Sequence, residues 1–91
     1  MSSPPATRVV RETLPSKLDS YHELLQSILK EMSELGWSDS ELLGVHLALE
    51  ESISNAIRHG NKEDPYKQVE VECRFSSDRF SAVICDEGPG F

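Results

Sequence analysis

Residues 47–60 read LALEESISNAIRHG, and this stretch predicts the element around which the rest of the chain is arranged. Its apolar residues recur at intervals of three and four, which is typical of a helix that buries one side. Gly60 is expected to end this helix. Glu51 and Asn55 lie four residues apart, so both side chains project from the same side of the predicted helix.

The same helix is predicted to begin at Ser38, because Ser38 and Glu41 have the spacing of a capping box. On a helical wheel one face is apolar and predicted to be buried: Leu42, Val45, Leu49, Ile53, Ala56 and Ile57. The roughly opposite face carries Gly44, Glu51, Asn55 and Arg58. Gly44 and the nearby Ala48 remove bulk from that side, which would let a ligand approach the helix.

Upstream, residues 8–14 alternate in polarity and predict an edge strand that Pro15 ends. Ser16 and Asp19 resemble a second capping box, so another helix is expected to follow. It should end at Gly36, with a left-handed glycine as its cap. The apolar stripe of this helix indicates plain core packing: Leu18, Tyr21, Leu24, Leu25, Ile28, Leu29, Met32 and Leu35.

Downstream of the central helix, residues 61–67 predict a loop, and residues 68–75 and 80–86 predict an antiparallel hairpin with one wet face. The register that keeps the core side apolar pairs Phe75 with Phe80, Cys73 with Ala82 and Val71 with Ile84.

This register has consequences for three side chains of the hairpin. It sets Cys73 and Cys85 on opposite faces, which disfavours a disulfide, and both are expected to be small buried hydrophobes. It also directs Asp86 toward the core side of the sheet. An ionised carboxylate there needs a hydrogen bond or a polar ligand.

The composition restricts the classes of partner. The chain has 91 residues and a formal charge of −7, from sixteen acidic against nine basic residues, which argues against nucleic acid and anionic lipid. Residues 1–7 predict a disordered tail without the apolar run of a signal peptide, and no segment is long and apolar enough to span a membrane. A cytoplasmic protein of one domain is expected.

Two groups of residues could carry chemistry. The oxygen of Asn55 suits a magnesium ion bound together with nucleotide phosphates, and Glu51 could accept a proton from an attacking hydroxyl or water. Asp86 could accept from the exocyclic amine of adenine, while Gly88 and Gly90 let the backbone approach the ring. Taken singly, the first pair is more often a solvated helix face, and the Asp-x-Gly-x-Gly pattern is more often a turn.

Together the two groups resemble a known family. Glu-x-x-x-Asn-Ala-x-x-His-Gly at residues 51–60 and Asp-x-Gly-x-Gly-Phe at residues 86–91 look like the first two nucleotide-binding boxes of the GHKL superfamily of gyrase, Hsp90, histidine kinases and MutL. Within that superfamily, the sequence is most similar to the anti-sigma-factor serine kinases. The resemblance extends from about Val9 to the last residue.

The resemblance implies an ATP- and Mg²⁺-dependent serine/threonine protein kinase that binds a sigma factor and phosphorylates an antagonist protein. It assigns a role to each matching residue, named here in chain order: Glu51 as general base, Asn55 as magnesium ligand, His59 and Gly60 near the phosphates, Asp86 as the reader of adenine, and Gly88 and Gly90 as the walls of the base pocket. His59 and Gly60 would otherwise be an ordinary helix C-terminus.

The predicted fold is α+β, a two-layer sandwich of one mixed or antiparallel sheet with two helices on one face, and so a partial Bergerat-type ATP-binding fold. Residues 8–91 would be the N-terminal part of such a domain, since the family's lid segment would follow residue 91. Exposed strand edges then predict a homodimer or other self-association. Two alternatives are a partner-binding module without catalysis and, ranked last, a histidine-kinase catalytic domain.

Overall fold

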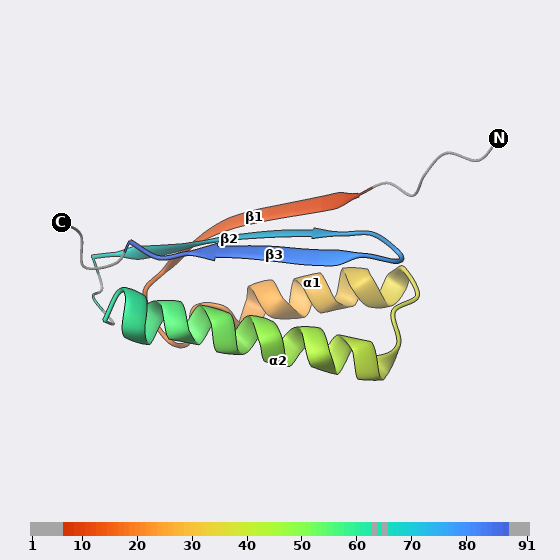
Figure 1. The fold of residues 1–91 in the computed structure, drawn as a ribbon, viewed down its shortest axis with the longest axis horizontal. Coiled ribbons are helices and arrows are strands. Elements are labelled where there is room, and N and C mark those ends of the chain that lie inside the picture. Colours follow the sequence, from red (N-terminus) through yellow and green to blue (C-terminus); the bar gives the residue numbers. More distant parts are fainter. Residues whose placement is uncertain (1–6, 63, 65, 88–91) are drawn as a thin grey trace.

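The protein is a two-layer α+β sandwich in which three antiparallel strands cover two helices (Figure 1). This computed structural model describes residues 7–62, 64 and 66–87. The order along the chain is β1 (Arg8–Pro15), α1 (His22–Glu34), α2 (Asp39–Asn55), a π-helical turn η1 (Ala56–Gly60), β2 (Gln68–Phe75) and β3 (Phe80–Cys85). The part of the tail in residues 1–6 lies outside the described residues.

The sheet confirms the predicted strands and their register. Its order is β1-β2-β3, so β1 is an edge strand, and both pairings are antiparallel. Phe75 pairs with Phe80, Cys73 with Ala82 and Val71 with Ile84, as the polarity of the hairpin predicts. A slip of one residue would have turned every apolar side chain of β2 toward water, which is why the pattern determines the register.

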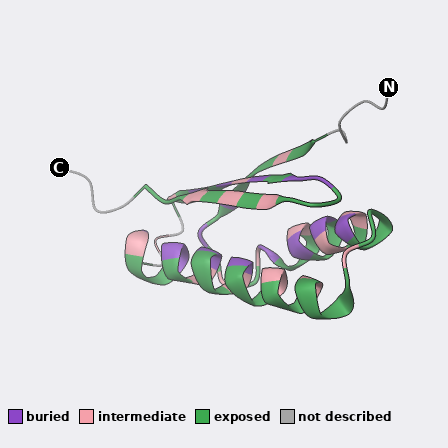
Figure 2. Ribbon diagram, turned by 45° about the vertical axis from the view of Figure 1, so that its right-hand side comes forward, coloured by how far each residue is buried: buried purple, intermediate pink, exposed green. Residues whose placement is uncertain are grey.

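The core lies between the sheet and the facing sides of the helices, where Figure 2 shows the buried positions. The predicted faces of the α2–η1 helix are confirmed at its C-terminal half, where Leu49, Ile53, Ala56 and Ile57 are buried, whereas Leu42 and Val45 are only partly buried against the core. The opposite face is exposed: Gly44, Glu51, Asn55 and Arg58. From α1 and the turn before it come Tyr21, Leu25, Ile28 and Met32, and from the sheet Leu14, Val69, Val71, Cys73 and Phe75.

The capping box of α2 is confirmed, but the one proposed for α1 is wrong. The backbone N–H of Glu41 donates to Ser38 Oγ at 3.2 Å, and Ser38 N donates to Glu41 Oε1 at 3.0 Å. By contrast, α1 begins at His22 after a turn in which Ser20 Oγ donates to the Pro15 and Lys17 carbonyls. Local side-chain bonds to the backbone thus replace the first helical turn that periodicity predicted.

The left-handed cap at Gly36 is confirmed, with φ +103°, but Gly60 is not such a cap. The helix does end at Gly60, through a π turn in which Asn61 N donates to the Ala56 carbonyl at 2.8 Å. Apart from Gly36, the positive φ in the described part of the chain belongs to Lys62, at 53°. The backbone angle of Gly60 therefore does not explain why this position is glycine.

Ser16 provides a test of the turn before α1. Its side chain is 2% exposed, and its hydroxyl has no hydrogen-bond partner among the described residues. A buried hydroxyl without a partner costs free energy, so Ser16→Ala is expected to raise the free energy of unfolding by about 1 kcal/mol in urea denaturation. Ser20→Ala is the matched control, because Ser20 makes two bonds, and it should lower stability. A clear loss of stability in Ser16→Ala would contradict the expectation.

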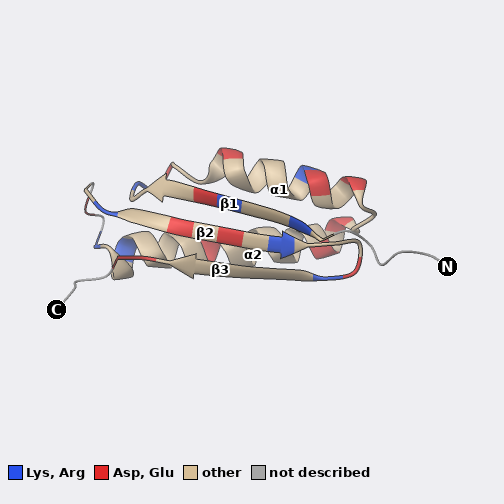
Figure 3. Cartoon of the chain, turned by 90° about the horizontal axis from the view of Figure 1, so that it is seen from above, with Lys and Arg blue, Asp and Glu red and all other residues tan. Residues whose placement is uncertain are grey.

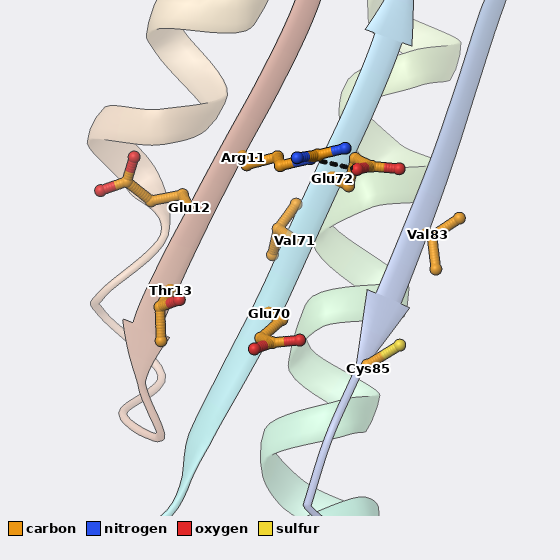
Figure 4. A pocket seen from close by; sticks show the side chains of 8 residues that line it. All are labelled: Arg11, Glu12, Thr13, Glu70, Val71, Glu72, Val83 and Cys85. Carbon is orange, nitrogen blue, oxygen red and sulfur yellow. Dashed lines mark hydrogen bonds and ion pairs between the residues drawn. The ribbon is translucent and has the colours of Figure 1, made fainter.

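The two faces of the sheet differ in charge. The outer face carries the acidic residues of β2 beside arginines of β1 and β2 (Figure 3). Arg11 Nε donates to Glu72 Oε1, and this bond lowers the pKa of the Glu72 carboxyl (Figure 4). A shallow pocket of about 350 Å³ lies on this face, lined by Glu70, Val83 and Cys85 among others. The predicted wet face is confirmed.

The cysteines are unpaired and lie on opposite faces, as predicted, but the expectation that both are buried holds only for Cys73. Burial raises the pKa of the Cys73 thiol to about 11, whereas Cys85 is exposed on the outer face. Since the thiolate is the nucleophile, we expect a thiol reagent at pH 8 to modify one cysteine rapidly in the native chain and two in urea. Cys85→Ser should abolish the rapid reaction, and rapid labelling that persists in this variant would contradict the structure.

Candidate nucleotide-binding site

The two sequence motifs meet where the end of the α2–η1 helix faces the end of β3. An open pocket of about 460 Å³ lies between them. Its walls come from both motifs and from the inner side of β3: Ser52, Asn55, Ala56, His59, Gly60, Ala82, Ile84 and Asp86. Residues 55 and 86, far apart in the sequence, therefore share one cavity.

Gly60 and Asp86 form the closest approach in this site. A Cβ atom added to Gly60 would lie 2.0 Å from Asp86 Oδ2 and 2.2 Å from Cγ. The Asp86 carboxylate thus occupies the space that any side chain at position 60 would fill. This close approach explains why position 60 requires glycine, which the interpretation as a helix cap did not.

The Asp86 side chain faces the helices, as the hairpin register predicts, but it is exposed to solvent rather than buried. No hydrogen bond or ion pair of the described residues involves its carboxylate. The carboxylate therefore retains its capacity to accept hydrogen bonds from a ligand that donates.

Asn55 and Glu51 differ in their relation to the pocket. Asn55 and His59, on successive turns, both contribute to the wall, and both side chains are exposed. Glu51 is also exposed, but it lies one turn earlier and outside the lining. Gly44 and Ala48 also lie outside the pocket lining. The pocket therefore does not form beside these two small residues, where a ligand was expected to approach the helix. Gly88 and Gly90 lie outside the described residues.

Asn61, the residue after Gly60, is a structural neighbour of this site that sequence reasoning missed. Its side chain is fully buried, with Nδ2 donating to the Gln68 carbonyl at 2.9 Å and Oδ1 accepting from Glu87 N at 2.8 Å. An asparagine in a segment rich in turn residues normally predicts an exposed turn, so no sequence signal marked it. The wall residue Ser52 could have been found, because it lies three residues before Asn55 and so about one turn away on the same helix.

The residues present fit a magnesium nucleotide. The pocket offers an amide oxygen at Asn55, which suits a hard cation that keeps several waters, and an available carboxylate at Asp86, which suits an amine donor. The space at Gly60 is preserved by the absence of a side chain. A two-layer sandwich in which a helix end and a strand end present these groups agrees with the nucleotide-binding domain that the sequence motifs resemble.

The chain belongs to the family of histidine kinase-like ATPase domains, whose family model matches residues 14–91. It is also similar to individual proteins over 59 residues, or 65% of this chain. It is 30% identical to the serine-protein kinase RsbW of Bacillus subtilis and 30% identical to the anti-sigma F factor of Oceanobacillus iheyensis. The serine-protein kinase RsbW of Bacillus licheniformis is 29% identical.

These matches cover 37% to 40% of the relatives' own length. The chain therefore spans less than half the length of these relatives, and it is the family model that establishes the family, with which the α+β fold agrees. In the described part of the chain, no helix is both long enough and apolar enough to cross a membrane.

Proposed function

We propose that this chain is the N-terminal part of an ATP- and Mg²⁺-dependent serine/threonine kinase that acts as a cytoplasmic anti-sigma factor. The observation that carries the proposal is the close approach of the Asp86 carboxylate to Gly60, which joins the two motifs in one pocket. The names of the relatives, serine-protein kinase and anti-sigma F factor, support the choice within the family. The partners would be a sigma factor and an antagonist protein that carries the reacting serine.

Each residue would have a separate task. Asp86 would accept from the exocyclic amine of adenine, and Gly60 would keep the space in which that carboxylate lies. Asn55 would hold the magnesium ion, which neutralises charge on the nucleotide phosphates when bound. Glu51 would take the proton of the serine hydroxyl on its carboxylate.

The position of Glu51 supports its proposed role as the base that accepts the serine proton. The reacting hydroxyl would belong to another protein, so its base must be reachable from solvent. Glu51 is exposed and stands beside the pocket rather than in its wall. Gly88 and Gly90 would flank the adenine, and His59 would lie near the phosphates.

Isothermal titration with magnesium-ATP tests the proposal, with Asp86→Asn as the matched variant. Replacing the carboxylate removes one strong acceptor, so affinity should fall about tenfold. Because Asp86 is exposed, the free energy of unfolding should hardly change. Equal dissociation constants for magnesium-ATP in the two proteins would refute the role of Asp86.

A partner-binding module without catalysis is the second candidate. Leu43 and Leu47 lie one turn apart on α2 and each is 57% exposed, so together they form apolar surface that a partner could cover. If titration gives no heat and the nucleotide does not protect against unfolding, this candidate remains and the kinase proposal fails for this chain.

Self-association is expected whether the chain is a kinase or a partner-binding module without catalysis. The edge strand β1 presents unpaired backbone groups, and the Leu43 and Leu47 side chains add apolar surface. Light scattering coupled to size exclusion should show species larger than 10.2 kDa as concentration rises. The double variant Leu43→Gln, Leu47→Gln should separate the leucine contribution from that of the strand edge. A monomer at high concentration would contradict the expectation.

A further inference from the structure

Three segments of the chain are joined by a closed ring of hydrogen bonds next to the pocket. Asn61 Nδ2 donates to the Gln68 carbonyl, Gln68 N donates to Glu87 Oε2, and Glu87 N donates to Asn61 Oδ1. The ring therefore links the end of the helix, the start of β2 and the chain just after β3. Each of the three residues both donates and accepts.

The ring fixes the backbone on one side of Asp86, while β3 fixes it on the other. Cys85 is the last residue of β3 and pairs with Glu70, and Glu87 N is held by Asn61. The Asp86 carboxylate itself has no hydrogen bond among the described residues, so its place against Gly60 is set by its neighbours. Moving Glu87 would move the carboxylate relative to Gly60.

The burial of Asn61 supports a role beyond closing a loop. A fully buried amide must have its donors and acceptor satisfied, and here a donor is used by the start of β2 and the acceptor by the residue after Asp86, which lines the pocket. Glu87, by contrast, is exposed, so its carboxylate bond adds little to global stability. Glu87 is thus a residue at which positioning and folding can be separated.

We propose that Asn61 and Glu87 are positioning residues for the nucleotide base, and that they do so by holding the Asp86 carboxylate where it can accept from an amino-purine. This inference rests on the proposed function. It assigns a role to Glu87, the second residue of the Asp-x-Gly-x-Gly motif, whose carboxylate accepts a hydrogen bond from the backbone N–H of Gln68. The ligands whose binding depends on these three hydrogen bonds are purine nucleotides that carry an exocyclic amine at the same position as adenine.

The test compares Glu87→Ala with Glu87→Gln, which keeps an acceptor oxygen for Gln68 N. Glu70→Ala is the matched control, because it removes the same charge from an exposed position on β2. Losing a negative charge by itself favours a polyanionic ligand, and this control measures that effect. Affinities for magnesium-ATP and for inosine triphosphate, which has a carbonyl in place of the amine, are measured by titration calorimetry.

A positioning role predicts that Glu87→Ala loses about tenfold in ATP affinity relative to Glu70→Ala and leaves inosine triphosphate unchanged. Glu87→Gln should restore the ATP affinity. An equal loss for both nucleotides, or no loss, would overturn the inference, since a merely structural residue would not alter the preference for the amine. Asn61→Ala should behave as Glu87→Ala if it folds.

A second readout does not need a nucleotide. The wild-type chain should give a nuclear Overhauser contact between the Gly60 Hα and Asp86 Hβ protons, and slow hydrogen exchange at the Glu87 amide. Both should weaken in Glu87→Ala and persist in Glu70→Ala. If wild type binds no nucleotide but these signals change as stated, the proposed function fails while the positioning by the ring stands. Unchanged signals in Glu87→Ala would refute the positioning itself.

Discussion

Gly60→Ala is expected to lower the affinity for magnesium-ATP by about tenfold to a hundredfold and to lower the free energy of unfolding as well. The added Cβ would lie 2.0 Å from Asp86 Oδ2, so the carboxylate must leave its place. The loss corresponds to one hydrogen bond to a charged acceptor. The added Cβ would also lie 2.8 Å from Asp86 Cβ, and rotating the carboxylate does not relieve that contact, so the backbone at residue 60 or 86 must shift and stability should fall as well. Titration calorimetry and urea denaturation measure the two quantities.

Gly44→Ala is the matched control for this variant. Gly44 lies on the same helix, and a Cβ added there would meet no heavy atom within 4 Å. It precedes Asn55 by three turns, or about 16 Å along the axis, and lies outside the pocket. ATP affinity should be unchanged, and stability should rise by up to about 1 kcal/mol. If both glycine variants bind ATP as wild type does, the close approach of Gly60 and Asp86 has no part in binding.

Phe75→Ala is expected to lower the free energy of unfolding by about 3–5 kcal/mol. Phe75 is 1% exposed, ends β2, and belongs to the single core between the sheet and the helices. For one domain of this length such a loss is a large part of the total stability, so much of the chain should be unfolded at 37 °C. Urea denaturation followed by circular dichroism gives the measurement.

Tyr66→Ala removes an aromatic ring of similar size from a site that is 94% exposed. Its free energy of unfolding should stay within about 0.5 kcal/mol of wild type, because little apolar area is lost from the core. A similar loss in the two variants would mean that burial is not the cause. A small loss in Phe75→Ala would mean that the core at this end of the sheet is not packed as described.

The elements that could be predicted from sequence are those with strong local patterns. The alternation of apolar and polar residues in β2 and β3 predicted the register, because pairing Phe75 with Phe80 is the arrangement that keeps one face apolar. The capping box at Ser38 and the left-handed Gly36 were also readable, since each depends on a few neighbouring residues. The start of α1 was not, because Ser20 bonds to the backbone in a turn that periodicity does not reveal.

The candidate site divides in the same way. The motifs placed Asn55, His59, Gly60 and Asp86 together by resemblance, and the structure brings these four into one pocket. It leaves Glu51 outside the wall and makes Asp86 exposed, where the strand pattern had implied burial. Alternation gives the direction of a side chain but not how much of the facing layer covers it. That coverage depends on where the helix ends relative to the strand.

The sequence by itself determined the strands, the hairpin register, the buried face of α2 and the side on which Glu51 and Asn55 project, because each follows from a period of 2.0 or 3.6 residues. Only the tertiary structure decided why position 60 is glycine and how Asp86 is held. Both depend on contacts between segments about 26 residues apart, in which Asn61 accepts from Glu87 and the Asp86 carboxylate fills the space at Gly60. No local pattern encodes such a contact, since it arises only when the helix end and the strand end are packed together.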